Sequence, residues 1–198
     1  MTHTHRLHCK RNLQITTFSL LAIAIILLLF VFFYPDVAAR APAITQTFTD
    51  QDAGFSLGYP DTLEKQPANS SQGDTIVLID ARKNFKISAW KESGLGILAS
   101  SGTVSLLDQL KTNVDRQYPA HYPDIDRQGI ADATLGGQPA FRINFSYMHP
   151  IYNRREHVQV TVTATKDSAF YVQCSSPVST WPFVEPVCRA VTESFVLQ

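Results

Sequence analysis

The chain has 198 residues, 44% of them apolar and 17% charged, which is ordinary for a globular protein and enough for one domain with a short appendage. The 17 basic and 17 acidic residues are unevenly spread, because the first 42 residues hold four basic residues and one acidic residue, leaving 13 basic and 16 acidic residues beyond them. A body with a net charge of about −3 has no clustered basic surface, so nucleic acid is excluded as a partner.

The N-terminal segment predicts a membrane anchor. Leu13–Tyr34 is a run of 22 residues without a charge, and roughly 20 apolar residues in a helix span the hydrocarbon core of a bilayer. Arg6, Lys10 and Arg11 precede this run, so the positive-inside rule places the N-terminus in the cytoplasm and the chain after Pro35 outside. We expect a basic cytoplasmic tail at residues 1–12, a transmembrane helix at 13–34, a linker at 35–45, and at 46–198 a periplasmic, extracellular or lumenal domain on a cell or thylakoid membrane.

Two other interpretations of the apolar segment remain open. Val37 and Ala39 are small enough for signal peptidase to cut after Ala39, which would release a secreted body, although the apolar cores of signal peptides are usually only about 7 to 15 residues long. A buried core helix is the other alternative, but such helices rarely have so long a charge-free run. An anchor and a signal peptide would both export the body.

The cysteines divide between the two compartments. Cys9 lies in the predicted cytoplasmic tail, while Cys174 and Cys188 lie in the exported body, where disulfides persist. These two cysteines can pair, and a bond across their separation of 14 residues contributes about 3 kcal/mol on the chain-entropy model. Two buried free thiols are the alternative.

Alternating apolar residues predict the strands of the body. In "GFSLGYP", Phe55, Leu57 and Tyr59 fall on one side of an extended chain, and Pro60 ends the strand. The preceding stretch, Ala41–Asp52, is expected to be a linker that leads into a first strand. Further strands are predicted at residues 75–81, 85–90, 128–135, 140–148, 157–166 and 168–174.

Two helices are predicted. Ser105 with Asp108 three residues later resembles a capping box, and Pro119 is expected to end the helix that begins there. Apolar residues recur at spacings of three and four along one face of this helix, namely Leu107, Leu110, Val114 and Tyr118. The second helix is predicted at residues 180–194, where Pro182 fits the first turn but Pro186 is expected to strain or shift the helix start. Strands in runs, with few helices between them, favour an α+β fold with an antiparallel sheet.

Three stretches in this order resemble the PsbP-like family. They are "GFSLGYPDTLE", which is similar to the Gly-aromatic strand and Tyr-Pro corner at the family's start, "GGQPAFRINFSY", and "AFYVQCSSP" followed by "VTESFVL". The resemblance covers residues 46–197. It implies an α/β/α sandwich with a central antiparallel sheet, the fold of the extrinsic PsbP subunit of photosystem II and of a Ran-binding nuclear import factor.

Motifs of enzyme chemistry are scarce. A His-Glu-x-x-His zinc helix, a phosphate-binding loop and a dinucleotide fingerprint are absent from the sequence. We therefore expect a protein that is not an enzyme and has no cofactor.

Polar and aromatic residues gather in three places that can serve as contact sites. "RQYPAHYPDID" holds Tyr118, His121, Tyr122 and Asp124, and this loop can form a partner surface, bind a divalent cation or simply face solvent. The stretch from 148 to 157 holds Arg154 and Arg155, which can meet an acidic partner or lipid headgroups, or can lie on a solvated hairpin tip. Trp181, near the start of the second helix, can pack against that helix start or contact a partner.

The combined expectation is a membrane-anchored, non-enzymatic protein whose extracytoplasmic domain binds or stabilises a membrane-associated protein partner. The lipid bilayer is its other partner, through residues 13–34. Three alternatives stay open: a module that binds a small ligand or a divalent metal, a protein secreted after signal-peptide cleavage, and a hydrolase that uses His121 or His157.

Overall fold

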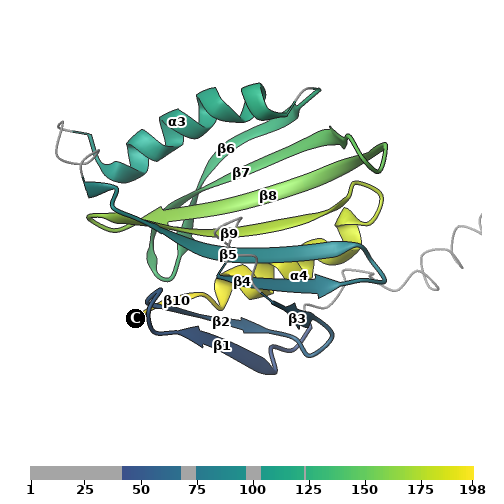
Figure 1. The fold of residues 1–198 in the computed structure, drawn as a ribbon, viewed down its shortest axis with the longest axis horizontal. Coiled ribbons are helices and arrows are strands. Elements are labelled where there is room, and N and C mark those ends of the chain that lie inside the picture. The colour runs from purple at the N-terminus through teal and green to yellow at the C-terminus, as the bar shows by residue number, and fades with distance from the viewer. Residues whose placement is uncertain (1–41, 68–74, 97–103, 123) are drawn as a thin grey trace, which may run out of the picture. The chain divides into compact units, whose positions relative to one another are not determined.

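A seven-stranded antiparallel sheet organises the body of the protein (Figure 1). The computed structural model describes residues 42–67, 75–96, 104–122 and 124–198, apart from the side chains of residues 115 and 118–121. The strands of the large sheet run in the order β3-β4-β5-β9-β8-β7-β6, and a smaller sheet has the order β1-β2-β10. The elements are β1 Gln46–Asp50, β2 Phe55–Tyr59, β3 Glu64–Gln66, β4 Ile76–Asp80, β5 Phe85–Ser93, α3 Leu106–His121, β6 Asp126–Leu135, β7 Gln138–His149, β8 Arg154–Ala164, β9 Ser168–Pro177, α4 Trp181–Glu193 and β10 Val196–Leu197.

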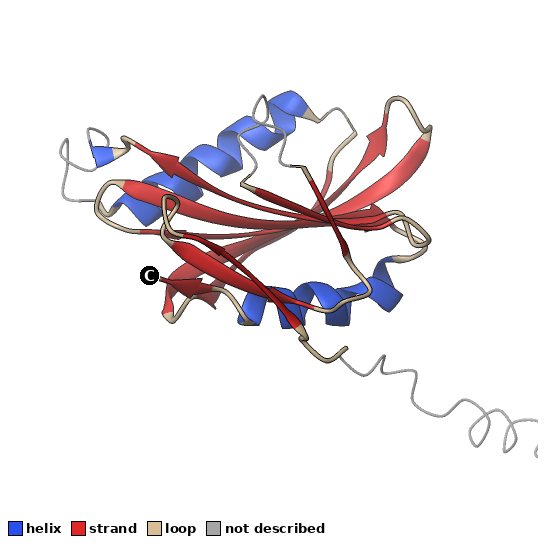
Figure 2. Cartoon of the chain, turned by 60° about the horizontal axis from the view of Figure 1, so that its bottom comes forward, coloured by secondary structure: helices blue, strands red, loops and turns tan. Residues whose placement is uncertain are grey.

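The two helices cover opposite faces of the large sheet (Figure 2). On the α3 side, alternate residues of β7 and β8 meet the apolar stripe of the helix, in which Leu106 and Leu110 are buried and Leu107 and Val114 partly buried. The sheet contributes Phe141, Ile143, Phe145, Val158, Val160 and Val162 to this core. The predicted α+β class is confirmed, and helices form layers on both faces of the sheet.

The second core lies on the α4 side. Phe55 and Leu57 of β2 are wholly buried there, together with Val184, Cys188 and Val191 of α4. Burying a side chain of this size contributes about 1.5–3 kcal/mol. The predicted alternation of β2 is thus confirmed, since its large residues point into this core.

The three stretches that resemble PsbP-like proteins meet at one junction of the fold. The Phe55 ring stacks on Phe195 at a centroid distance of 5.1 Å, and the N–H of Gly58 donates a hydrogen bond to Ser194 Oγ at 2.9 Å. Gly136, in the turn between β6 and β7, has a φ of +60°, and a Cβ there would lie 3.2 Å from the Phe195 ring. Glycine is needed at this turn because both its φ and the close contact disfavour a side chain.

The predicted Tyr-Pro corner turns the chain away from β2. The strand ends at Tyr59, whose partly buried side chain packs against the core of the α4 side. The N–H of Leu63 then bonds to the carbonyl of Pro60 at 3.1 Å, closing a tight turn. The stretch expected to be a linker contains a strand, because Gln46–Asp50 pairs with β2 along its whole length.

The start of α3 agrees with the sequence, whereas its end does not. Ser105 Oγ lies 2.7 Å from the Asp108 carboxylate and accepts a hydrogen bond from the Asp108 N–H at 3.2 Å, which caps the helix. The predicted end at Pro119 is wrong, since the helix continues to His121. The fixed φ of proline is close to the helical value, so Pro119 removes one hydrogen bond without forcing the chain out of the helix.

The second helix begins at Trp181 after Thr180, with Pro182 in its first turn as predicted. The expectation that Pro186 shifts the helix start is wrong, because Pro186 lies inside the helix and its ring is buried. The stabilisation that this burial provides offsets the backbone hydrogen bond that a proline cannot make.

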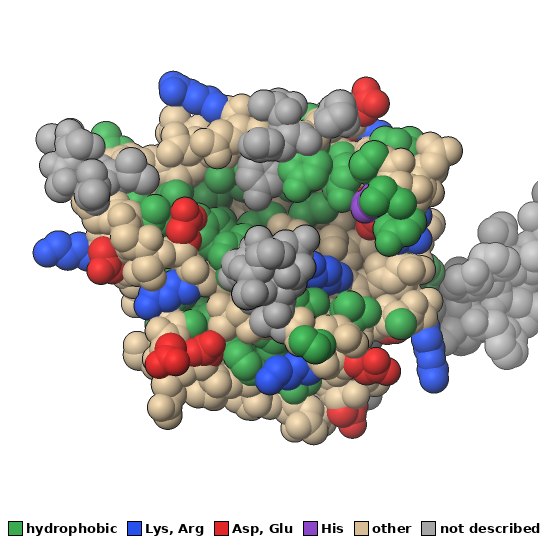
Figure 3. Space-filling model, viewed as in Figure 1, with side chains coloured by type: hydrophobic (Ala, Val, Ile, Leu, Met, Phe, Trp, Pro, Cys, Tyr) green, Lys and Arg blue, Asp and Glu red, His purple; other side chains and the backbone are tan. Residues whose placement is uncertain are grey.

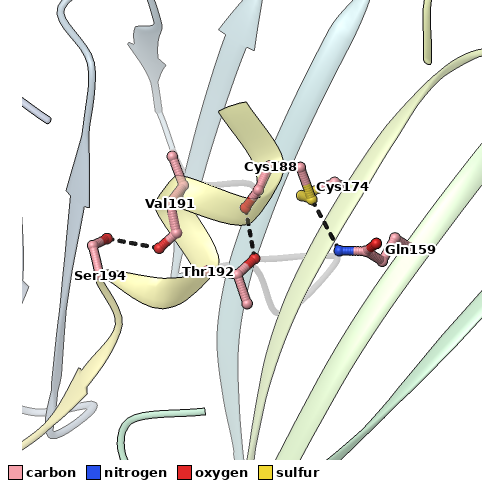
Figure 4. Close-up of a disulfide and its surroundings, with 6 residues drawn as sticks. All are labelled: Gln159, Cys174, Cys188, Val191, Thr192 and Ser194. Carbon is pink, nitrogen blue, oxygen red and sulfur yellow. Dashed lines mark hydrogen bonds between the residues drawn. A yellow bond between two sulfur atoms is a disulfide. The ribbon is translucent and has the colours of Figure 1, made fainter. Parts of the chain in front are cut away.

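A disulfide fastens α4 to the sheet (Figure 4). Cys174 of β9 is bonded to Cys188 of α4, with their Cα atoms 6.0 Å apart. Both residues are fully buried, and Gln159 Nε2 of β8 donates a hydrogen bond to Cys188 Sγ at 3.2 Å. The predicted pairing is confirmed, and the alternative of two free thiols is wrong.

The predicted transmembrane helix at residues 13–34 lies outside the described residues, as do the tail at 1–12 and the start of the linker. Among the residues that the structure describes, no helix has both the length and the apolar character needed to cross a bilayer.

Candidate functional site

Exposed apolar side chains gather at one end of the large sheet, around the β7–β8 turn and the connection from β9 to α4 (Figure 3). Five of the eight large apolar side chains that are exposed in the described part of the chain lie there. They are Met148, Ile151, Tyr152, Val178 and Phe183, and we call them the hairpin-end surface. Ile151 is the most exposed of them at 81%, followed by Tyr152 at 62%. Soluble domains rarely leave such residues clustered unless they contact something.

One hydrogen bond and one ring contact hold the two parts of this surface together. The N–H of Val178 donates to the carbonyl of Arg155 at 3.0 Å, which keeps the β9–α4 connection beside the start of β8. One turn further on, the Trp181 ring packs on His157 of β8 at a centroid distance of 4.0 Å. Burial lowers the pKa of His157, an effect that Glu185 of α4 partly opposes, so the imidazole under Trp181 stays neutral near pH 7.

The β7–β8 turn presents its apolar residues in a fixed conformation. His149 Nδ1 accepts hydrogen bonds from the N–H groups of Ile151 at 3.2 Å and Tyr152 at 3.4 Å. Asn153 closes the turn with a φ of 45°, a conformation that asparagine tolerates better than most residues. Ile151 and Tyr152 therefore point outward from an ordered turn, which lowers the entropic cost of a contact.

A row of aromatic rings supports the turn from the α3 side. Tyr122 packs against Phe145 at 5.3 Å and against Tyr147 at 4.6 Å, and Tyr147 in turn lies 6.0 Å from His149. Burial, with smaller contributions from Tyr122 and Glu156, raises the pKa of Tyr147 to about 12, and burial also raises the pKa of Tyr122. Both phenols are therefore neutral at physiological pH and act as packing groups.

The two arginines at this end are anchored by neighbouring groups. Arg154 Nε lies 2.7 Å from the Glu156 carboxylate, and its guanidinium lies 4.9 Å above the Tyr152 ring. Arg155 donates to Ser146 Oγ and to the carbonyl of Asp124, each at 3.2 Å. The arginines thus form a positive rim beside the exposed apolar residues.

The structure brings together most of the residues that the sequence singled out. Tyr122, Asp124, Arg154, Arg155 and Trp181 all lie at this end of the sheet. The side chains of two others, Tyr118 and His121, are outside the described residues. Within the described residues, no group of three or more His, Cys, Asp or Glu side chains is placed to hold a metal ion.

Sequence reasoning missed the apolar members of the surface. Ile151 and Tyr152 left a signal, because an apolar pair between His-Pro and Asn-Arg-Arg is unusual in a short turn. Phe183 left none, since an apolar residue in a helix pattern is normally assigned to the core.

The letters Gly-x-Ser-x-Gly occur at residues 54–58, yet the structure gives them no nucleophile elbow. Such an elbow needs a sharp turn from a strand into a helix. Ser56 instead lies in the middle of β2, paired with Thr49 of β1 and Val196 of β10. Its neighbours form an ordinary ladder.

A cavity of about 70 Å³ lies between α3, β6 and β7, beside the β6 bulge. Val114, Ile130 and Phe145 are among the residues that line it. Pockets for small molecules usually measure roughly 300–1,000 Å³, so this cavity is a packing defect large enough only for a few atoms.

Comparisons with known proteins bear on the fold. No family model matches the sequence, and neither does any curated protein. Cyanobacterial PsbP (CyanoP) from Synechocystis sp. PCC 6803 superimposes with a TM-score of 0.57 at 14% identity, covering 83% of this chain and 99% of that one. The chain has a PsbP-like fold.

Two further PsbP-like structures show how widely this fold occurs. LpqN of Mycobacterium tuberculosis, described as involved in cell envelope biogenesis, matches with a TM-score of 0.52 at 17% identity, covering 77% of this chain and 91% of that one. The Ran-binding protein Mog1p of Saccharomyces cerevisiae matches with a TM-score of 0.50 at 8% identity, covering 78% and 96%. At such identities the likeness concerns the fold, and function must be argued from the site.

Proposed function

We propose that this protein is a non-enzymatic, single-pass membrane protein whose extracytoplasmic PsbP-like domain binds a membrane-associated protein through the hairpin-end surface. The observation that carries the proposal is the outward position of Ile151 and Tyr152 on an ordered turn, at the same end of the sheet as the exposed Met148, Val178 and Phe183. Aromatic residues, methionine and arginine are the side chains enriched at protein interfaces.

The charged rim supports a protein partner. Arg154 is already paired with Glu156 and lies on the Tyr152 ring, while Arg155 is fixed by Ser146 Oγ and the carbonyl of Asp124. Arg155 therefore needs little further ordering to pair with an acidic residue of the partner. Such anchored charges around an apolar centre match the division of protein interfaces into core and rim. We expect a partner that offers an apolar socket with acidic residues at its edge.

The anchor at residues 13–34 explains how a small surface can suffice. A domain held on a membrane meets membrane-bound partners at a high effective concentration, so a weak contact can be well occupied. The fold of LpqN, a protein of cell envelope biogenesis, is compatible with such a location.

Site-specific photo-crosslinking of the full-length chain in its native membrane tests the proposal. A photoreactive residue at Ile151 is expected to give a discrete adduct, and the same residue at Val104, which is also exposed but lies before α3, is expected to give none. The protein found in the adduct should then bind the purified domain at least tenfold more weakly after Tyr152→Asp, and unchanged after Val104→Asp. Equal background at both positions, or equal effects of the two variants, would contradict the proposal.

A further inference from the structure

The α4 face of strands β7 and β8 is unexpectedly polar for a buried sheet face. The apolar residues of both strands point to the α3 side, which leaves the alternate residues for the α4 side. These residues are Arg142, Asn144 and Ser146 on β7 and His157, Gln159, Thr161 and Thr163 on β8. All four from β8 are at least nine-tenths buried. We call this area the polar face.

Unpaired polar atoms are concentrated on this face. Four buried side-chain nitrogen or oxygen atoms have no hydrogen-bond partner in the described part of the chain: Arg142 Nε, Asn144 Oδ1, Thr161 Oγ1 and His157 Nε2. All four belong to the polar face. Leaving a buried donor or acceptor unpaired costs about 1–3 kcal/mol, and folded proteins contain few such groups. A cluster of them indicates a place where another molecule completes the hydrogen bonds.

Three of the four residues are neighbours on the polar face. Arg142 is paired directly opposite Thr161 in the β7–β8 ladder, so their Cβ atoms are about 4.5–5.5 Å apart. Asn144 follows two residues later on the same face, roughly 6–7 Å along β7. His157 is four residues from Thr161, roughly 13 Å along the strand, and its ring is already covered by Trp181.

The chemistry of the three groups selects the ligand. Within the described residues no carboxylate forms a salt bridge with Arg142, so its positive charge is available to an anion. Thr161 can donate to the same anion, while Asn144 Oδ1 is an acceptor and needs a donor, which a hydroxyl on the same ligand can supply. Glu185 acts on His157, at the other end of the face, where an anion would be repelled. Arg142 and Asn144 are both partly exposed, so part of each side chain faces solvent beside the buried, unpaired atoms.

We propose that Arg142, Asn144 and Thr161 form a binding site for a small oxyanion that also carries a hydroxyl group. The Arg142 guanidinium holds the negative oxygens of the ligand, and the Thr161 hydroxyl donates a hydrogen bond to them. The Asn144 amide oxygen accepts a hydrogen bond from the hydroxyl of the ligand. Hydrogen phosphate and a hydroxy acid share this chemistry. The site is on the α4 side of the sheet, involves no residue of the hairpin-end surface, and does not depend on the proposed function.

Ligand-dependent melting of the domain, residues 41–198, tests the site; these residues form a compact unit of their own. Phosphate, lactate and acetate are compared at constant ionic strength, with sodium chloride as the reference. Phosphate or lactate is expected to raise the melting temperature more than acetate, which lacks a hydroxyl, and the better of the two identifies the source of the anion. The shift should vanish in Arg142→Gln and persist in Arg116→Gln, a matched arginine exposed on α3.

A second variant keeps the test decisive if Arg142→Gln fails to fold. Thr161→Val preserves the side-chain shape and removes an unpaired buried hydroxyl, so it is expected to raise the melting temperature of the free domain while weakening anion binding at least tenfold. The proposal is overturned if no anion exceeds the chloride reference, if Arg142→Gln and Arg116→Gln respond alike, or if Thr161→Val leaves binding unchanged.

Discussion

Reducing the bond between Cys174 and Cys188 is expected to destabilise the domain by an amount that the structure allows to be worked out. The bond spans 14 residues from the end of β9 to the middle of α4. On the chain-entropy model, opening a loop of this size costs about 3 kcal/mol of unfolding free energy. Both cysteines are fully buried, and reduction opens the cross-link without removing a buried side chain, so the entropic effect is expected to dominate.

The assay is urea unfolding of residues 41–198 with and without reductant, followed by the fluorescence of Trp90 and Trp181. With an m-value of about 2 kcal/mol/M, a loss of about 3 kcal/mol lowers the midpoint by about 1.5 M. The variant with Cys174→Ala and Cys188→Ala is the control, since it must not respond to reductant. A midpoint that moves by less than about 0.3 M would refute the assignment of a stabilising cross-link between β9 and α4.

Three other predictions concern single side chains. Because burial lowers the pKa of His157, the unfolded state binds a proton at mildly acidic pH that the folded state does not bind. The stability that this residue contributes is therefore complete above its ordinary pKa of 6.5 and is lost as the pH falls below that value. Urea midpoints measured from about pH 5 to 7 should fall as the pH falls in the wild type and change less in His157→Gln. Gly58→Ala should lower the unfolding free energy by about 1–3 kcal/mol, because its Cβ would lie 2.6 Å from Ile44 Cγ2 and 3.1 Å from Ser194 Cβ. Gly96→Ala, where the Cβ would lie 3.5 Å from Asp167 Cβ, should change it far less, and equal losses in chemical denaturation would contradict the close approach at Gly58. In an alkaline titration followed by tyrosinate absorbance, Tyr147→Phe should remove a component with a pKa of about 12, and loss of a component near 10 would show that the ring is not buried.

The parts of the fold that the sequence predicted are those in which one face is buried. The strands β2, β7 and β8 could be predicted from alternating apolar residues because every second residue enters a core. The start of α3 could be predicted because Ser105 caps it. β1 and β3 were missed because their residues are mostly polar and exposed, so nothing in their composition separates them from a loop. The prediction for Pro186 was wrong because its ring is buried by residues distant in the sequence, and helix propensities consider only the local sequence.

The candidate sites show the same division. The sequence pointed to Arg154, Arg155 and Trp181 by residue type, but only the pairing of β8 with β7 and β9 shows that they share one end of the sheet. The polar face was hidden for a different reason. Gln159 and Thr161 alternate with valines as if they faced solvent, whereas α4 and the rest of the fold bury them.

The location of the domain is tested most directly by thiol labelling of the full-length chain in intact cells. Cys9 serves as the reporter of the tail, and Val104→Cys, at an exposed position before α3, serves as the reporter of the domain. If the domain lies outside the cytoplasm and residues 13–34 anchor it, a membrane-impermeant maleimide reacts with the cysteine at 104 in intact cells and with Cys9 only after lysis. The chain also stays in the membrane after carbonate washing. Protection of the cysteine at 104 from the impermeant maleimide until lysis would contradict an extracytoplasmic domain.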